Sequence, residues 1–283
     1  GVQGVEFYIA NTDLQAMDIS PVANKIQLGK EGLGAGGNPD NGRKAAVESE
    51  DAIRKSMEGA DMVFLTAGMG GGTGTGAAPL FAKIAKELGC LTVGIVTKPF
   101  NFEGKRRERN AEQGLEQLKE YVDSLIIISN NKVLEVIGHI PFQDAFKEAD
   151  NILRQGVQTI TDLIAVPAMI NLDFADVSAV MKDKGIAHVG IGKAKGDDKA
   201  IEAVKIAISS PLLESTIEGA TDVNINISGD ISLIEANDEA SYVEELVGEN
   251  ANIIFGAMYD EDSQDEVSIT VIATGIKERT KTV

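Results

Sequence analysis

The sequence predicts an α/β fold made of a parallel-sheet domain, a long central helix and a smaller α+β domain. In the first half, short apolar runs alternate with helical patterns, which is typical of strands buried on both faces of a parallel sheet. An apolar stripe at helical spacing then runs through residues 145–164, and Pro167 is expected to end this helix. Beyond it strands and helices no longer alternate regularly, which favours a separate mixed domain.

Length and composition restrict the possible functions. The chain has 283 residues, enough for two ordinary domains, and 43% of them are hydrophobic, enough for a substantial core. Its formal net charge of −18 argues against a protein that coats nucleic acid or anionic membranes. The single cysteine, Cys90, excludes a disulfide framework, and no apolar run is long enough for a membrane span. We therefore expect a cytoplasmic protein without direct membrane insertion.

The predicted elements follow in order along the chain. Four apolar runs predict strands at residues 5–10, 62–67, 91–96 and 125–129, and helical patterns separate them at residues 40–57, 77–88 and 105–121. After the central helix, helices are expected at residues 174–183, 198–208 and 238–247, and strands at 188–192, 223–228, 252–258 and 267–274. The expected domains are residues 1–143, the central helix at 144–167, the second domain at 168–276 and the start of a tail at 277–283.

Polar or glycine-rich segments follow each strand of the first half. They lie at residues 11–13, 68–76, 97–103 and 130–131. The carboxyl ends of parallel strands meet at one edge of the sheet, where open α/β sheets bind ligands. This crowding predicts a ligand site at that edge.

The strongest motif is Gly70-Gly71-Gly72-Thr73-Gly74-Thr75-Gly76. It follows a buried strand and precedes a helix expected to open at Ala77, with Pro79 in the first turn. Consecutive glycines let backbone N–H groups face an anion, and the start of a helix adds a favourable dipole. The alternative is a merely tight or flexible loop, but such a linker would not interrupt a packed strand and helix. The motif therefore predicts a phosphate-binding loop.

The residues alone leave the phosphate ligand open. The chain lacks G-x-x-x-x-G-K-[ST], which excludes an ordinary P-loop. Residues 32–37 match G-x-G-x-x-G, but Asn38-Pro39-Asp40 intervenes before the helix, unlike in a dinucleotide fingerprint. An oxidoreductase would also need an acidic residue at the end of the next strand, where Ala67 and Gly68 stand.

Residues 68–79 resemble the signature of the tubulin/FtsZ superfamily, and most closely that of its bacterial cell-division branch. Residues 11–13, 32–39, 99–104, 171–176 and 209–213 resemble the same family in the expected order, so the likeness spans nearly the whole chain. It implies a Rossmann-like GTPase domain in a self-assembling GTPase that polymerises head to tail into protofilaments of the division (Z) ring at mid-cell. It also implies GTP or GDP as the ligand, with Mg²⁺ held through the phosphates and no dedicated metal residues.

The family pattern assigns roles to individual residues. For the phosphates it implies the motif residues Gly70, Gly71, Gly72, Thr73, Gly74, Thr75 and Gly76, and a γ-phosphate loop of Gly34, Ala35, Gly36 and Gly37. On the ribose and phosphate side it implies Pro99, Glu103 and Arg107. At the guanine it implies Asn130, Asp150 and Phe146. A carboxylate suits guanine because it accepts the paired N–H donors on one edge of that base. Without the resemblance, Phe146 is more simply a core residue and Asp150 a solvated one.

The resemblance places catalysis in residues 171–176. From the residues alone, Asn171 or Asp173 more simply caps the helix that follows. The family pattern implies that this loop enters the nucleotide site of the next subunit, with Asn171, Asp173 and Asp176 as the catalytic group and both aspartates polarising the attacking water. Hydrolysis would then require polymerisation. A non-hydrolysing structural filament is the remaining alternative, and it has no need of both carboxylates.

Some segments depart from the family pattern. The opening strand and first phosphate loop of the family are absent, and residues 29–32 and 138–141 are shorter than the family norm. We expect that the sequence omits residues at these places. The family meets its division partners through a C-terminal tail that residues 277–283 only begin.

Overall fold

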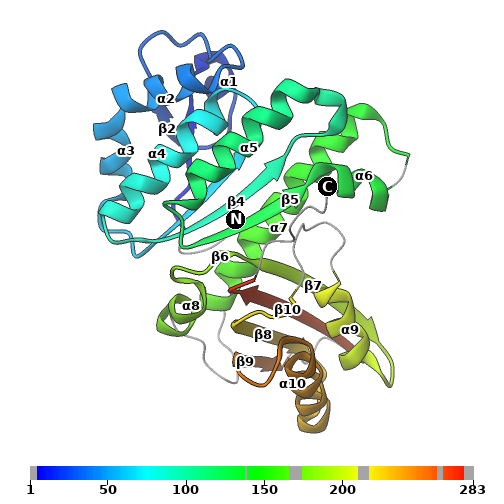
Figure 1. The fold of residues 1–283 in the computed structure, drawn as a ribbon. Helices are drawn as coiled ribbons and strands as arrows, with labels where there is room; N and C mark the ends of the chain where they lie inside the picture. The colour runs from blue at the N-terminus through cyan, green and yellow to red at the C-terminus, as the bar shows by residue number, and fades with distance from the viewer. Residues whose placement is uncertain (1–4, 138, 166–173, 210–216, 260–263, 277–283) are drawn as a thin grey trace. The chain divides into compact units, whose positions relative to one another are not determined.

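The computed structural model describes residues 5–137, 139–165, 174–209, 217–259 and 264–276. They belong to two compact units, residues 1–149 (unit 1) and residues 150–283 (unit 2). The division between them falls inside the long helix α7 (Phe142–Ala165), which corresponds to the expected central helix (Figure 1). None of the helices in these described ranges is long and apolar enough to cross a membrane.

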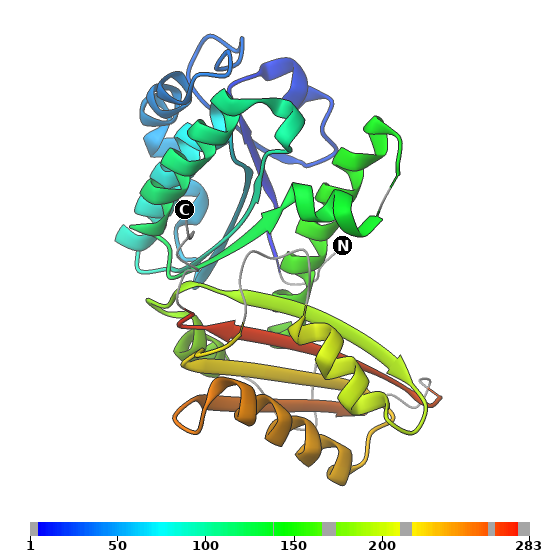
Figure 2. The same cartoon turned by 45° about the vertical axis from the view of Figure 1, so that its right-hand side comes forward.

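Unit 1 contains a parallel sheet in which β4 (Leu91–Lys98) pairs with β3 (Met62–Gly68) and β5 (Ser124–Ser129). Every residue of β5 is buried, as is all of β4 except its last residue, which explains why their sequences are continuously apolar. The edge strand β3 is only partly buried. Helices α4 (Thr73–Glu87) and α5 (Lys105–Lys119) cover one face of the sheet (Figures 1 and 2). The predicted parallel-sheet domain is confirmed.

The first strand, β1 (Tyr8–Asn11), does not join this sheet, contrary to the expectation from the sequence. It pairs in parallel with β2 (Asn24–Gln27), and the short helix α1 (Leu14–Asp18) connects them. The sequence Asn-Lys-Ile-Gln of β2 has no apolar run that could have predicted a strand. The backbone hydrogen bonds of β1 are therefore made with β2 and not with the main sheet.

Two helices differ from their predicted bounds. The helix expected at residues 40–57 is divided into α2 (Pro39–Glu48) and α3 (Glu50–Met57) at Ser49. The Ser49 hydroxyl donates to the Gln27 carbonyl and accepts from the Gly29 N–H, both at 2.9 Å, and so ties the break to the end of β2. Helix α4 begins at Thr73 rather than Ala77, because Gly72 takes the N-cap position. Pro79 therefore lies beyond the first turn, where its ring removes one intrahelical N–H donor.

The other elements of unit 1 follow the carboxyl ends of β4 and β5. A short 3-10 helix, η1 (Asn101–Glu103), follows β4, and α6 (Asn130–Ile137) begins directly at the end of β5. The first turns of α7 pack Ala145 and Ala149 against the buried Phe100. A second core lies between β2, α2, α3 and α4, and includes Ile26, Ala46, Ile53, Ala77 and Ile84.

Unit 2 is a mixed sheet in the order β7-β10-β8-β9, and the predicted separate C-terminal domain is confirmed. Its strands are β7 (His188–Lys195), β8 (Asp222–Gly229), β9 (Asn252–Tyr259) and β10 (Glu266–Thr274), preceded by α8 (Phe174–Met181) and the short β6 (Gly185–Ile186). The β8–β9 pair is parallel and the other pairs are antiparallel. Helices α9 (Lys199–Ile208) and α10 (Leu233–Val247) share a core with this sheet (Figures 1 and 2).

Two details of unit 2 depend on single residues. Helix α10 begins at Leu233 rather than Asp238, because Ser232 and Glu235 form a capping box. Helix α9 approaches β7 so closely that a Cβ at Gly192 would lie 1.8 Å from the Ala203 carbonyl oxygen, which only glycine permits. His188 is buried, with its Nε2 3.1 Å from the Ala207 carbonyl oxygen, in agreement with a structural role.

Candidate functional site

The glycine loop, residues 69–72 between β3 and α4, packs against the loops that follow β1 and β2. Thr73 Oγ1 lies 2.6 Å from Thr12 Oγ1, and the Gly34 N–H donates to the Thr12 carbonyl at 3.2 Å. A Cβ at Gly72 would lie 2.7 Å from Ala35 Cβ, so the absence of a side chain lets the two glycine-rich segments touch. The structure thus brings residues 34–37 and 70–73 together at one edge of unit 1.

The start of α4 is open, whereas the start of α2 is capped. Gly72 occupies the N-cap position of α4, and no side chain caps that helix. Its first N–H groups therefore lack intrahelical acceptors and, together with the helix dipole, favour an anion. At α2 the Asn38 side chain accepts from the Asp40 N–H at 3.0 Å. The uncapped start of α4 therefore offers helix N–H donors to an anion, whereas the Asn38 side chain already accepts from one at the start of α2.

Pro99 and Arg107 border the glycine loop on the side of β4 and α5. A Cβ at Gly70 would lie 3.2 Å from Pro99 Cγ and 3.0 Å from the Arg107 carbonyl oxygen. The Arg107 guanidinium pairs with Glu103 at 3.1 Å and stays half-exposed. Glu103 also accepts from the Phe100 N–H at 2.7 Å, so its carboxylate is fixed beside the loop. These three predicted residues therefore lie together.

Asn130 carries an unsatisfied buried acceptor. It is 6% exposed at the point where β5 ends and α6 begins, and its Oδ1 has no hydrogen-bond partner in the structure. The neighbouring Asn131 exchanges two hydrogen bonds with Asn101, at 2.9 and 2.8 Å, and so holds this helix start against η1. A buried acceptor without a partner is costly, so this oxygen points to a donor on a bound ligand.

Phe146 belongs to an aromatic cluster that also contains Phe100, Phe102 and Phe142. Phe100 is buried, whereas Phe102, Phe142 and Phe146 are 50%, 64% and 40% exposed. Phe146 meets Phe100 edge-to-face with ring centroids 5.3 Å apart, so it is available at the surface and is not a core residue. Asp150 lies one turn later on α7, and desolvation raises the pKa of its carboxyl.

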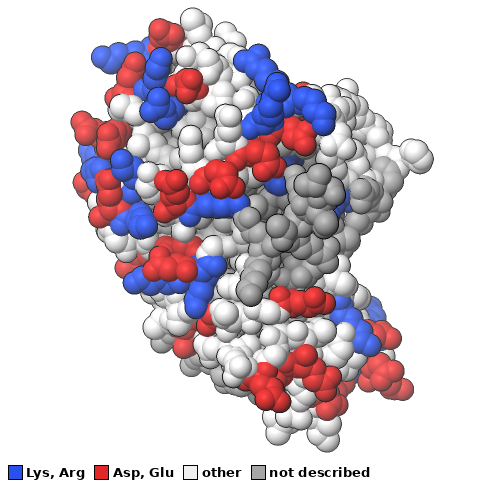
Figure 3. All heavy atoms as spheres, viewed as in Figure 1, with Lys and Arg blue, Asp and Glu red and all other residues white. Residues whose placement is uncertain are grey.

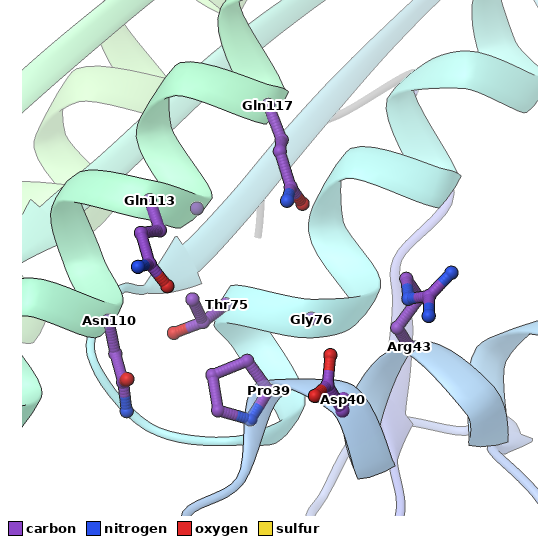
Figure 4. A pocket seen from close by; sticks show the side chains of 9 residues that line it. Pro39, Asp40, Arg43, Thr75, Gly76, Asn110, Gln113 and Gln117 are labelled. Carbon is purple, nitrogen blue, oxygen red and sulfur yellow. The ribbon is translucent and has the colours of Figure 1, made fainter.

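Three residues of the glycine motif face away from the open end of α4. A Cβ at Gly74 would lie 2.7 Å from the Gly68 carbonyl oxygen, and one at Gly76 would overlap the Pro39 carbonyl oxygen. Thr75 is 2% exposed, and its hydroxyl accepts from the Gly70 N–H at 2.8 Å. Thr75 and Gly76 line a small polar pocket between α2, α4 and α5 (Figure 4). These residues support the loop from behind, and their direct contact with a nucleotide stays a prediction.

The predicted catalytic residues are only partly covered by the structure. Asn171 and Asp173 lie outside the described residues. Asp176 lies in the first turn of α8 in unit 2, with its side chain partly buried. Within the described ranges, no group of three or more His, Cys, Asp or Glu residues could hold a metal ion.

Sequence reasoning assigned no site role to Thr12, Asn110, Phe102 or Phe142. Thr12 lies in a segment that follows a strand and resembles the family, but neither signal assigned it a contact with the glycine loop. Asn110 contacts the glycine loop from 40 positions away in the chain, and nothing in the local helical pattern indicates that contact. Phe102 and Phe142 join Phe146 only through the folded arrangement of η1 and α7.

Comparisons with known proteins cover both units. The family model described as "Tubulin/FtsZ family, GTPase domain" matches residues 2–138, and that described as "FtsZ family, C-terminal domain" matches residues 185–277. The curated relative "Cell division protein FtsZ" of Mycoplasmopsis pulmonis (strain UAB CTIP) is 54% identical over 285 residues, covering 99% of this chain and 73% of that protein.

Two solved structures from M. jannaschii have a similar fold. The structure titled "FtsZ dimer, empty" has a TM-score of 0.89 and 44% identity, over 97% of this chain and 82% of that chain. The "FtsZ W319Y mutant, P1" has a TM-score of 0.91 and 43% identity, over 100% of this chain and 87% of that chain.

Proposed function

The chain belongs to the tubulin/FtsZ family of GTPases as an FtsZ cell-division protein, and from this premise we propose that it hydrolyses GTP between head-to-tail subunits. The nucleotide would lie on unit 1 and the next turn of α7, with its phosphates at the open start of α4 and the segment 34–37. The orphaned Asn130 acceptor is the observation that carries the nucleotide part of the proposal, because a guanine N–H would supply the donor that it lacks. Asp150 would accept the remaining donors and Phe146 would stack on the base.

The phosphates would be held mainly by backbone. The N–H groups of Gly72, Thr73 and residues 35–37 would donate without adding charge, and Arg107 beside Glu103 would supply a local cation. The Gly34 N–H is already used, because it donates to the Thr12 carbonyl. Local donors of this kind bind an anion even though the net charge of the chain is −18. Mg²⁺, when bound through the phosphates, would neutralise part of their charge during hydrolysis.

Unit 2 of the next subunit would supply the catalytic group. Asp173 and Asp176 would accept hydrogen bonds from a water molecule and orient its oxygen toward the γ-phosphorus. A new P–O bond forms to this oxygen, the bond to the β–γ bridging oxygen breaks, and GDP and inorganic phosphate result. The water protons pass to the phosphate and to solvent. A single subunit would hold GTP without this group, so turnover would follow assembly.

Each unit has an exposed apolar patch with charged residues beside it, and these charges are positive in unit 1 and negative in unit 2. In unit 1 the exposed aromatic cluster adjoins Lys105, Arg106 and Arg109 at the start of α5. In unit 2 Leu233 and Ile234 are 87% and 75% exposed at the start of α10, and the exposed charged residues of this helix, Asp238, Glu244 and Glu245, are all acidic. Figure 3 shows the basic side chains over the start of α5 and the acidic ones over α10. Two different complementary patches suit a head-to-tail contact, which repeats into a filament.

A mixing experiment tests this arrangement. Leu233→Glu would remove the unit 2 patch and Phe142→Glu the unit 1 patch, so neither variant should polymerise or turn over GTP alone. Burying a leucine contributes about 1.5–3 kcal/mol, so each loss should weaken association at least tenfold. In an equimolar mixture, the intact unit 1 of Leu233→Glu can still contact the intact unit 2 of Phe142→Glu. This contact joins the nucleotide site of the first variant to Asp176 of the second, so turnover should return.

Adding Asp176→Ala to the Phe142→Glu partner should abolish that recovery. Ile206→Glu, at a 51% exposed site on α9, is the matched control and should assemble normally. GTP binding by each variant is measured first. Failure of the mixture to recover turnover, with GTP binding intact, would contradict the head-to-tail site. Assembly without turnover in the unmodified protein would favour the alternative of a non-hydrolysing filament.

A further inference from the structure

The Gly70 peptide is held on every side by residues behind the glycine loop. Its N–H donates to the Thr75 hydroxyl at 2.8 Å, and its carbonyl accepts from the Asn110 side-chain amide at 3.2 Å. Gly70 has a φ of +114°, and its Cα packs against Pro99 and the Arg107 backbone. The position thus requires glycine, and the Asn110 amide reaches it from a separate helix.

Helix α5 can approach the loop because of Gly114. A Cβ at Gly114 would lie 2.6 Å from Thr75 Cγ2 and 2.7 Å from Met69 Cε, so a larger residue would require these side chains or α5 to shift. Figure 4 shows Asn110 on α5 and Thr75 on α4 at the wall of the polar pocket, with Gln113 and Gln117 on the same side of α5. Among these α5 side chains, Asn110 donates a hydrogen bond to the glycine loop.

The direction of the Gly70 carbonyl fixes the direction of the next N–H. A trans peptide is planar, and its C=O and N–H bonds point in opposite directions. The chain has no cis peptide bond among the described residues. The Asn110 amide draws the Gly70 carbonyl toward α5, so the Gly71 N–H must point away from α5. Gly71 borders open space, since a Cβ there would meet nothing within 4 Å.

We propose that Asn110 is a positioning residue for phosphate binding, which aims the Gly71 N–H at the nucleotide by holding the Gly70 carbonyl. This inference rests on the proposed function, because it assumes that an anion occupies the open side of the loop. Without the Asn110 amide, the Gly70–Gly71 peptide is free to rotate, and a rotated peptide would present a carbonyl oxygen to the phosphate. Asn110 thereby acts on ground-state binding of the nucleotide, at a distance from the group that activates water.

Substitution of Asn110 separates positioning from packing. Asn110→Leu keeps a similar volume but removes the donor, and Gln117→Leu makes the same kind of change elsewhere in the pocket wall. Equilibrium binding of GDP and GTP, kcat at saturating GTP, and the urea unfolding midpoint are measured on the full chain. Asn110→Leu should weaken binding of both nucleotides about three- to tenfold, the range for loss of one hydrogen bond, and leave kcat and the midpoint unchanged. Gln117→Leu should change none of the three.

Two results would overturn the inference. One is wild-type nucleotide affinity in Asn110→Leu, and the other is a loss of affinity matched by a fall in the unfolding midpoint, which indicates general loosening of α5. Failure of the unmodified chain to bind GTP is a different result, because it would remove the proposed function itself before any variant is compared.

Discussion

Glu239 on α10 provides a quantitative test of the energetics of unit 2. Its side chain is fully buried, and neither carboxyl oxygen has a hydrogen-bond partner in the structure. Burial, with a smaller contribution from the Glu235 charge, raises the pKa of Glu239 from 4.5 to about 9. The folded protein therefore holds this carboxyl protonated at neutral pH, whereas the unfolded chain releases the proton.

The sign of the pH dependence follows from this difference. Because the folded pKa is the higher one, the folded state binds the extra proton, and stability falls as pH rises from 4.5 to about 9. The slope is about 1.4 kcal/mol per pH unit, so about 3 kcal/mol is lost between pH 4.5 and pH 7. Glu239→Gln keeps the shape and removes the titration. It should stabilise the protein by about 3 kcal/mol at pH 7 and by less than about 1 kcal/mol at pH 5.

Urea unfolding followed by circular dichroism at pH 5, 6, 7 and 8 measures this directly. The control is Glu244→Gln on the exposed side of the same helix, which should leave stability nearly unchanged at every pH. A Glu239→Gln protein that is less stable than wild type at pH 7, or whose stability difference does not vary with pH, would refute the reasoning.

Three further predictions concern the site. Gly72→Ala should weaken GTP binding at least tenfold in a titration. The added Cβ would lie 2.7 Å from Ala35 Cβ and 2.8 Å from the Asn38 nitrogen, and would force the two glycine segments apart. Unchanged affinity would mean that the segments can separate freely. Asn130→Leu should leave the ligand-free protein at least as stable, since it removes an orphaned acceptor. It should reduce the stabilisation by GDP in thermal unfolding by about 1–3 kcal/mol. An undiminished stabilisation by GDP would mean that Asn130 does not contact the ligand. Asp176→Ala should keep GTP affinity and lose steady-state turnover, and normal turnover would remove its catalytic role.

The sheet strands could be predicted from sequence where burial dictates composition. Strands β4 and β5 are buried on both faces, so their apolar runs mark them clearly. Strand β2 escaped prediction because its four residues are largely polar and depend on pairing with β1. The break between α2 and α3 depends on the Ser49 side chain reaching β2, a tertiary contact that helical periodicity does not contain.

In the candidate site, too, local motifs could be predicted from the sequence, whereas contacts between distant segments could not. The glycine motif indicated a phosphate loop because a glycine run between strand and helix has few other uses, and its contact with phosphate stays a prediction. The sequence did not indicate that α4 begins inside this motif, so that Thr75 supports the loop from behind. The bond from Asn110 to Gly70 joins segments 40 residues apart and depends on the close approach that Gly114 permits. Such contacts exist only once α5 is packed on the sheet.

The central claim is that GTP is hydrolysed at a site shared by two subunits. The most direct measurement is the specific GTPase activity as a function of protein concentration, with light scattering recorded in the same samples. We predict that activity per subunit is near zero below a threshold concentration and rises above it together with scattering. Activity per subunit that is constant across the threshold would contradict the shared site.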